Sequence, residues 1–419
     1  MSDAASARQL WRARFRLTWE AVRSSYWFIP SVMAVLAGAA AIATLELDQR
    51  LPPEWLARVR WVAGDADGAR AMLSTIAGSM ITVAGVTFSI IMVVLPLASS
   101  QFGPRLIRNF LRDPGTEIVL GTFIGTFVYC LLVLLAVRGG ERELVPHLSV
   151  TAGVGTGLLS LAVLIYFVQH VAASIRVENV IHSASRDIHR TIAEVFPGSI
   201  GLESDAVVPA GDERARIGGS DADAYVVTAH RSGYIEHLDG TGLIQVAADH
   251  DVVFELLRRP GDYLVAGEPI GRVWRAGDRG PFLGERLRER LFIGRQRTPL
   301  HDLVAAVERL TEIAVRALSP AVNDPYTAIN CIDELSAALG SLADYDLPAA
   351  YRYDAEGRMR LIAVPVTFAE VVTAAYDPLR LYGAAQPAVL ASLLQGYARI
   401  GRCSDRPEVR VALRQGADA

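Results

Sequence analysis

Lysine is absent from this sequence, and all 41 of its basic residues are arginine. A Schiff-base lysine, a P-loop lysine and a lysine that carries biotin or lipoate are therefore excluded. Cysteine is scarce, because Cys130, Cys331 and Cys403 are the whole set and no CxxC motif occurs. An odd and scattered set argues against a disulfide framework and against a zinc site, and it favours a reducing compartment.

Catalytic signatures are also missing. The sequence contains no GxSxG, no HExxH, no Walker A loop and no GxGxxG after a strand. His182 and His189 share a helix face without a carboxylate or thiol at ligand spacing in the sequence. The net charge of −4 gives no indication of a nucleic-acid partner. We therefore expect no enzyme, no cofactor and no metal.

What the chain has in abundance is hydrophobic sequence, since 51% of its residues are hydrophobic and the mean hydropathy is +0.28. The long apolar runs gather before Val171, and each has the length of about 20 residues that a bilayer demands. None carries a charged side chain in its interior. The predicted transmembrane helices span residues 27–45, 73–97, 118–137 and 148–168.

Arginine counts predict the orientation. The segment before the first helix, the loop after the second and the segment after the fourth are rich in arginine, whereas the opposite loops mix arginine with many acids. Positive residues favour the cytoplasmic side, so both termini are predicted there, in a multi-pass protein of the plasma (inner) membrane. The first run is longer than a signal-peptide core and follows a leading segment of residues 1–25, which argues against cleavage.

Small and hydroxyl-bearing residues recur on one face of the second predicted helix, and the third carries a GxxxG motif with two threonines beside it. Ordinary close helix packing explains this pattern, because small residues let backbones approach. The rival interpretation is a polar seam that lines a pore. The residues are Gly78, Thr82, Gly85, Ser89, Gly121, Thr122, Gly125 and Thr126.

The loop after the second helix predicts a short amphipathic helix on the cytoplasmic surface, with its arginines toward lipid phosphates. It could couple the membrane part to the cytoplasmic part through Gln101, Arg105, Arg108 and Arg112.

The C-terminal part has the composition of a polar α+β domain. Residues 172–222 predict a helical extension and a linker, residues 223–282 a β-rich module, and residues 283–419 a mostly helical region. The module is similar in layout to the small β-sandwich that carries biotin or lipoate, although the missing lysine excludes that role. No internal repeat is apparent.

A helix break at residues 318–328 contains three polar residues of interest. Asp324 fits an N-cap with Pro325 at the first helical position, and capping alone explains the pattern. Alternatively, Asn323, Asp324 and Thr327 bind an ion or a polar ligand at the helix amino terminus.

Three parts of the chain resemble a family of predicted bacterial membrane proteins known as domain of unknown function 2254. The resemblance rests on residues 87–105, on Gly121-Thr122-Phe123-Ile124-Gly125-Thr126-Phe127 and on residues 317–325. It implies four membrane helices and a cytoplasmic domain, and it brings no activity and no catalytic residue.

The predicted fold class is therefore membrane α-helical, with about four transmembrane helices in residues 26–171, plus a C-terminal α+β cytoplasmic domain with a small β-rich module. Two functions remain open. One is a homo-oligomeric channel or pore for ions or small solutes, with a cytoplasmic assembly and gating domain. The other is a membrane-anchored sensor or scaffold that binds a ligand or partner. The expected partners are the lipid bilayer, further copies of the chain, and ions or small solutes. A secondary transporter is disfavoured by the lack of intramembrane charge and of a repeat.

Overall fold

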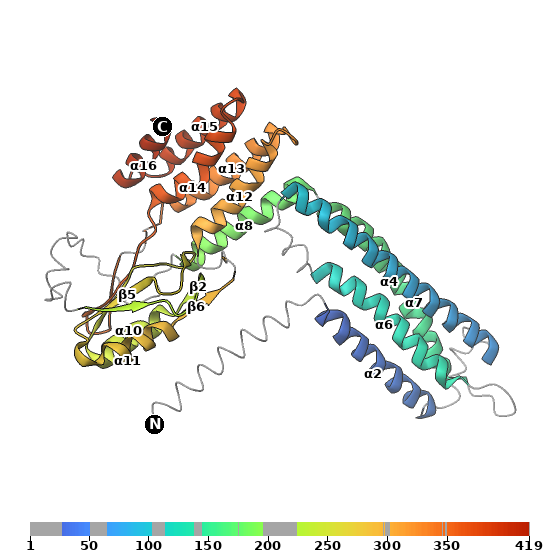
Figure 1. Cartoon of the computed structure of the whole chain (residues 1–419). Coiled ribbons are helices and arrows are strands. Elements are labelled where there is room, and N and C mark those ends of the chain that lie inside the picture. The colour runs from blue at the N-terminus through green and yellow to red at the C-terminus, as the bar shows by residue number, and fades with distance from the viewer. Residues whose placement is uncertain are drawn as a thin grey trace. The chain divides into compact units, whose positions relative to one another are not determined.

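The chain divides into two compact units, Met1–Asn179 and Val180–Ala419 (Figure 1). Our computed structural model describes residues 27–50, 65–102, 114–137, 145–174, 176–195, 224–295, 297, 302–345, 347 and 350–418. The first unit is helical and the second combines helices with two small sheets. The predicted class is thereby confirmed.

Four helices of the first unit are long and apolar enough to cross a membrane, as predicted. They are α2 (Phe28–Arg50), α4 (Ala66–Phe102), α6 (Pro114–Ala136) and α7 (His147–Ser174). The second candidate span, Ala66–Leu97, ends where predicted but begins seven residues earlier, and α4 itself continues through Pro96 to Phe102. A proline costs a helix one backbone hydrogen bond, and membrane helices tolerate that loss.

Helix α6 is the centre of this unit. It packs against α2, α4 and α7, and it is the most buried of the four spans. Cys130 lies fully buried on α6, in one apolar cluster with Leu73 of α4 and Val150 of α7. The four spans are therefore held together through α6.

A carboxylate near the end of α2 caps the amino terminus of α7. Asp48 accepts hydrogen bonds from the backbone N–H groups of Leu148 and Ser149, both at 2.9 Å, and from Ser149 Oγ at 2.6 Å. Tyr129 of α6 joins the cluster, because its hydroxyl donates to the Ser149 carbonyl and bonds Thr44 Oγ1. The first N–H groups of a helix lack partners within it, and an acidic group there is favoured by the helix dipole.

Helix α8 (Val177–Val195) confirms the helix predicted after the fourth span, although α7 ends at Ser174 and α8 starts anew. Ile181, Ile188 and Ile192 are buried along one face of α8, in the second unit. The predicted linker that follows lies outside the described residues.

The strand-rich module contains more helix than the sequence suggested. Its elements are β1 (Tyr225–Thr228), β2 (Gly233–Leu238), α10 (Gly240–His250), β3 (Val253–Leu256), β4 (Tyr263–Leu264), β5 (Pro269–Trp274), η2 (Gly277–Arg279), α11 (Gly280–Glu289) and β6 (Leu291–Gly294). Asp239 is the N-cap of α10, since its carboxylate accepts from Gly242 N at 2.9 Å. The likeness to a biotin-carrying sandwich therefore does not extend to the fold.

The module is a twofold internal repeat of strand, strand, helix and strand. β1 pairs with β5 as β4 pairs with β2, and β2 pairs with β6 as β3 pairs with β5, all antiparallel. Exchanging the two halves therefore exchanges the pairs. At one constant spacing Tyr225 matches Tyr263, Gly233 matches Gly271 and Phe254 matches Phe292. Sequence analysis missed this repeat because few residues carry it.

A later hairpin breaks the symmetry of the module. Strands β7 (Tyr351–Tyr353) and β8 (Met359–Ile362) extend the first sheet, whose order is β1-β5-β3-β8-β7, through a parallel pairing of β8 with β3. The second sheet has the order β4-β2-β6.

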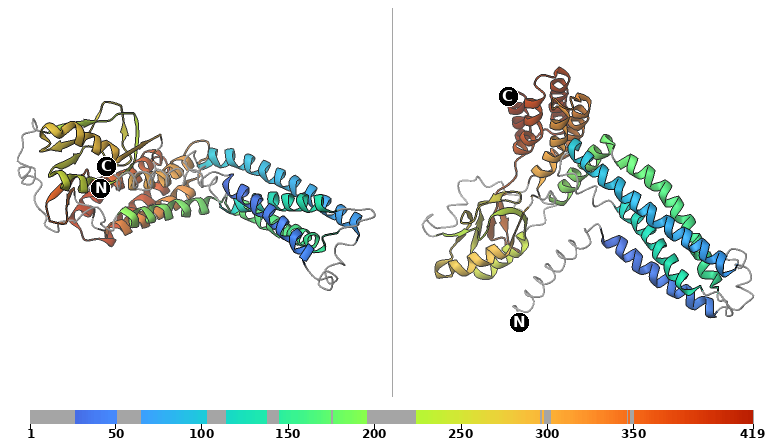
Figure 2. Two further views of the ribbon diagram at one scale, coloured as in Figure 1. Left: turned by 90° about the horizontal axis from the view of Figure 1, so that it is seen from below. Right: turned by 45° about the vertical axis from the view of Figure 1, so that its right-hand side comes forward.

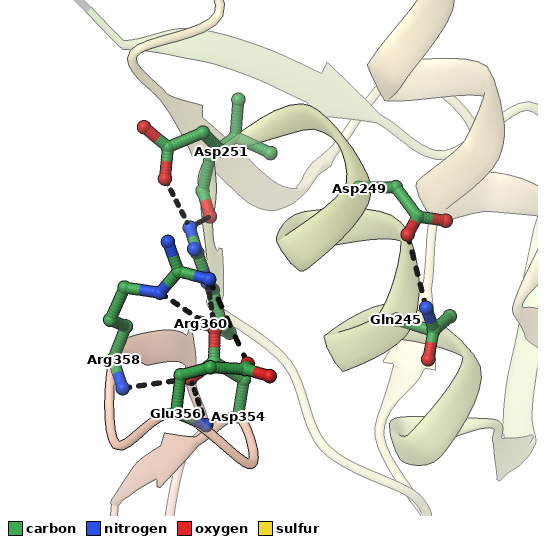
Figure 3. A network of polar contacts seen from close by, with 8 residues as sticks. Gln245, Asp249, Asp251, Asp354, Glu356, Arg358 and Arg360 are labelled. Carbon is green, nitrogen blue, oxygen red and sulfur yellow. Dashed lines mark hydrogen bonds and ion pairs between the residues drawn. The ribbon is translucent and has the colours of Figure 1, made fainter.

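A buried arginine ties this hairpin to the module (Figure 3). The Arg360 side chain is 2% exposed, and its Nε donates to Asp354 Oδ2 at 2.8 Å while its Nη1 donates to Asp251 Oδ1 at 2.9 Å. Burial acts to raise the pKa of the Asp354 carboxyl, but the hydrogen bonds from Arg360 and from Arg358 N outweigh it and hold that pKa below its usual value. The Arg360 hydrogen bond likewise lowers the pKa of Asp251.

Five helices complete the unit: α12 (Leu303–Ala317), α13 (Pro325–Leu342), α14 (Phe368–Tyr382), α15 (Pro387–Cys403) and α16 (Pro407–Asp418). Their core includes the hydroxyls of Ser336 and Tyr376, which bond each other at 2.6 Å, while the rings of Tyr376 and Tyr397 meet edge to face. Burial raises the pKa of Tyr397 to about 12.

We expect Arg360→Leu to release the hairpin, because it leaves the Asp354 carboxylate buried without its cation, at a cost of about 3 kcal/mol. Hydrogen exchange of the segment 351–362 at pH 7 measures this as faster exchange. Arg358→Leu is the matched control, since its side chain is 58% exposed and its loss changes little.

The same contact predicts a pH dependence. Carboxylates with a lowered folded-state pKa stabilise the fold above their unfolded pKa, and that contribution disappears as the pH falls through the folded pKa. Protection of the segment, corrected for intrinsic exchange, should therefore fall below about pH 4 in the wild type. Equal protection of wild type and Arg360→Leu at pH 7 would contradict this account of the hairpin.

Candidate functional site

The GxxxG motif of α6 packs against α2. A Cβ atom on Gly121 would lie 2.5 Å from Met33 Sδ and 3.2 Å from Pro30 Cα, and one on Gly125 would lie 3.4 Å from Ala37 Cβ. A side chain at position 121 would press on Met33 and on the backbone at Pro30, so the motif lets α6 and α2 approach closely within one chain.

The two threonines beside this motif have separate roles. Thr126 is buried, and its hydroxyl bonds Ser160 Oγ of α7 at 2.9 Å. Thr122 donates to the Ile118 carbonyl of its own helix at 2.8 Å. Both hydroxyls are therefore satisfied within the chain.

The small residues of α4 face the other way. Gly78, Thr82, Gly85 and Ser89 are all exposed, and no described atom lies within 4 Å of a Cβ placed on Gly78 or on Gly85. Thr82 satisfies its hydroxyl by donating to the Gly78 carbonyl at 2.8 Å. We call these four residues the outward face of α4. Within one chain, this face and the GxxxG motif of α6 do not form a single seam.

The predicted coupling segment falls mostly outside the described residues. Gln101 belongs to the last turn of α4, but its side chain is outside the description, as are Arg105, Arg108 and Arg112. The coupling role stays a prediction.

The polar residues at the α12–α13 turn serve the turn itself. Asp324 is the N-cap of α13 and Pro325 its first residue, which confirms the capping prediction. Both Thr327 N and Thr327 Oγ1 donate to the Asp324 carboxylate, at 3.1 and 2.7 Å, and the side-chain bond lowers its pKa. Asn323 adopts a left-handed φ of 48°, and its Oδ1 accepts from Gln386 Nε2 at 3.3 Å. These contacts explain the turn, and ligand binding by the three residues stays a prediction.

Within the described ranges, no group of three His, Cys, Asp or Glu side chains could hold a metal ion. The structure does bring a carboxylate to His182, whose Nδ1 lies 3.2 Å from Glu334 Oε1. Ser185 Oγ donates to the other oxygen of Glu334 at 2.6 Å. Cys331 is buried, and burial raises the pKa of its thiol, while Cys403 is exposed.

Sequence reasoning missed two acidic residues at the ends of the membrane helices. Asp48 caps α7, and no local pattern predicts this contact, because Asp48 and Ser149 lie 101 positions apart along the chain. Glu117 is buried in the first turn of α6, a position that favours acidic residues. Placing the helix start at Ile118 rather than at Pro114 left Glu117 outside the span.

Comparison with known proteins assigns the chain to a family. The model of a family described as predicted membrane protein, domain of unknown function 2254, matches residues 23–399. An uncharacterized protein of Mycobacterium tuberculosis is 32% identical over 357 residues, which cover 84% of this chain and 67% of that protein. An uncharacterized protein of Mycobacterium bovis matches to the same extent. No solved structure matches the chain. The chain therefore belongs to the predicted membrane protein family called domain of unknown function 2254.

Proposed function

We propose that this protein is a homo-oligomer whose subunits meet along the outward face of α4 and enclose a path for ions or small solutes. The proposal rests on one observation. Gly78 and Gly85 lie open on the surface of the helix, with no described atom within 4 Å of their Cβ positions. A backbone that approaches this face from another chain would meet no side chain on these glycines, and such faces favour helix association in a bilayer.

The chemistry of α4 suits an uncharged path. No charged residue occurs between residues 71 and 104, which include the whole outward face. Thr82 and Thr75 donate their hydroxyl hydrogens to carbonyls of their own helix, so each hydroxyl oxygen keeps acceptor capacity for a passing cation or water. Rings of oxygen acceptors replace the hydration shell of ions in pores.

The path requires more than one chain. Helix α6 fills the centre of the unit with Val133, Phe123 and Cys130, all fully buried, so the interior of a single chain is packed with side chains. The solute path of the proposal consequently runs between subunits.

The second unit would lie on the cytoplasmic side of the plasma membrane, with both termini there, because arginine is concentrated on that side of the predicted spans. It would serve as the assembly and gating part of the oligomer.

A membrane-anchored scaffold is the alternative function. It uses the same α4 contact for dimerisation and needs no path through the bilayer. Association without flux would favour this alternative.

We expect Gly85→Leu and Ser89→Leu to weaken association roughly tenfold or more, which corresponds to 1.4 kcal/mol of lost contact, and to abolish flux. Neither change should unfold a single chain, because both positions are exposed. The measurements are oligomer mass in detergent and ion flux into liposomes under an applied voltage.

Two variants serve as controls for this experiment. Ile90→Phe adds bulk at an exposed position that lies about 80° or more around the helix from every residue of the outward face, and it should keep both mass and flux. Gly125→Leu should instead disrupt the packing of α6 on α2 and lower the thermal stability. A monomeric wild type, or flux and mass that survive both α4 substitutions, would refute the pore.

The orientation has its own test. Cys403 is exposed while Cys130 and Cys331 are buried, so Cys403 is expected to be the main labelling site. A membrane-impermeant maleimide should label Cys403 in inside-out vesicles and leave it unlabelled in intact cells. Labelling in intact cells would reverse the proposed topology.

A further inference from the structure

Two helices of the second unit start at the strand module and run away from it. Gly261 lies against the carboxylate of Asp302, the N-cap of α12. Arg259 Nη1 donates to Glu370 Oε2 in the first turn of α14 at 2.7 Å. Helices α12 and α14 pack on each other, and both have 15 residues. They therefore end together about 22 Å from the module, at 1.5 Å per residue.

Four large apolar side chains are exposed at this end. They are Val322 at 52%, Tyr326 at 79%, Leu381 at 68% and Tyr382 at 62% exposure. The hydrogen bond from Gln386 to Asn323 joins the turn after α12 to the turn after α14. We call these four residues the apolar end cluster. Soluble surfaces rarely gather such side chains without a partner.

The surroundings of the apolar end cluster carry almost no charge. Residues 317–323, 325–332 and 381–398 contain no Asp, Glu or Arg. The one exception, Asp324, directs its carboxylate to Thr327. Arg316 and Arg380 lie in the last turns of α12 and α14, just before the two turns in the sequence. Tyrosines at the tip with arginines behind them are the arrangement of a bilayer interface, where rings sit at headgroup level and cations meet phosphates.

The turn that presents Val322 and Tyr326 is held in one shape. Asp324 N donates to the Ala317 carbonyl and Asn323 N to the Ser319 carbonyl, both at 2.8 Å. The exposed side chains are thus held before any contact, which reduces the entropy lost on binding.

Within the second unit, α8 packs on the helices that lead to and from the turn between α12 and α13. Figures 1 and 2 show α8 beside these helices, and Asp187 of α8 accepts from Arg309 of α12 while Ser185 donates to Glu334 of α13. Helix α7 ends at Ser174 and α8 begins at Val177. Three residue steps span about 10 Å at most. Whatever the placement of the units, the first turn of α8 stays that close to the end of a membrane span.

We propose that the apolar end cluster is a membrane-docking surface that rests on the phospholipid bilayer. A second copy of the chain fits the observations less well. A stable protein interface needs roughly 800 Å² on each partner, which four side chains at a helix end do not supply. A bilayer interface requires no complementary shape, and it accepts a few aromatic and aliphatic side chains at a time.

The test places a nitroxide at Tyr326 in the full-length protein, reconstituted in phosphatidylcholine liposomes. Tyr326→Cys is made with Cys403→Ser, because Cys403 is the exposed native thiol. Tyr345→Cys is the matched control, since Tyr345 follows the opposite end of α13 and is also exposed. Collision with oxygen, which partitions into lipid, is compared with collision with a polar nickel complex.

The proposal predicts an oxygen-to-nickel ratio several-fold higher at position 326 than at position 345 in liposomes. Equal ratios at the two positions in liposomes would overturn it. Spin–spin broadening at position 326 that persists in detergent would also overturn it, in favour of a second copy. Neither outcome depends on α4. The docking proposal can therefore fail while the pore proposal holds, and the reverse is also possible.

Discussion

Hydrocarbon offers no hydrogen-bond partners, and this constraint governs the first unit. Every backbone N–H and C=O within the membrane must be satisfied inside the segment, which only helices achieve here. The exceptions come at helix ends, where the first N–H groups are free. Asp48 meets that need at α7 from the neighbouring helix α2, with Tyr129 of α6 bonded to the same turn. One polar contact thus fixes the relative positions of three spans.

Glycine has two different roles in this unit. In α6, Gly121 and Gly125 pack against Met33 and Ala37 of α2, and this contact stabilises a single chain. In α4, Gly78 and Gly85 contact nothing among the described residues. Since hydrophobic burial does not drive helix association in lipid, a face of small residues left open is the kind of surface that can gain packing from another helix. The exposed glycines of α4, unlike those of α6, therefore support the proposed assembly of several chains.

The four spans, the helix after the fourth span, the N-cap at Asp324 and the strand-rich module could be predicted from the sequence, because each depends on local pattern. The length and uncharged composition of a segment predict a membrane span, and a single Asp-Pro pair predicts a helix N-cap. Helix α10 could not be predicted in this way, because glycines at positions 240 and 242 are typical of a turn. Only the structure shows that Asp239 caps a helix there.

The remaining features depend on residues that are distant in the sequence. In the sequence, Arg360 is an ordinary arginine of a strand. Its role depends on the pairing of β8 with β3, which brings its side chain to Asp251. Likewise, the division between the two glycine sets emerges only when α6 packs on α2. The internal repeat is evident from the strand pairing, because only a few matching residues carry it in the sequence.

Disulfide trapping in native membranes tests the central claim, that α4 meets α4 of another copy, most directly. A disulfide requires Cβ atoms about 4 Å apart, so Ser89→Cys in a Cys403→Ser chain should form a covalent dimer under mild oxidation. Ile90→Cys, which is exposed on another side of α4, should remain monomeric. Absence of the Ser89 dimer, or equal trapping at both positions, would contradict the account.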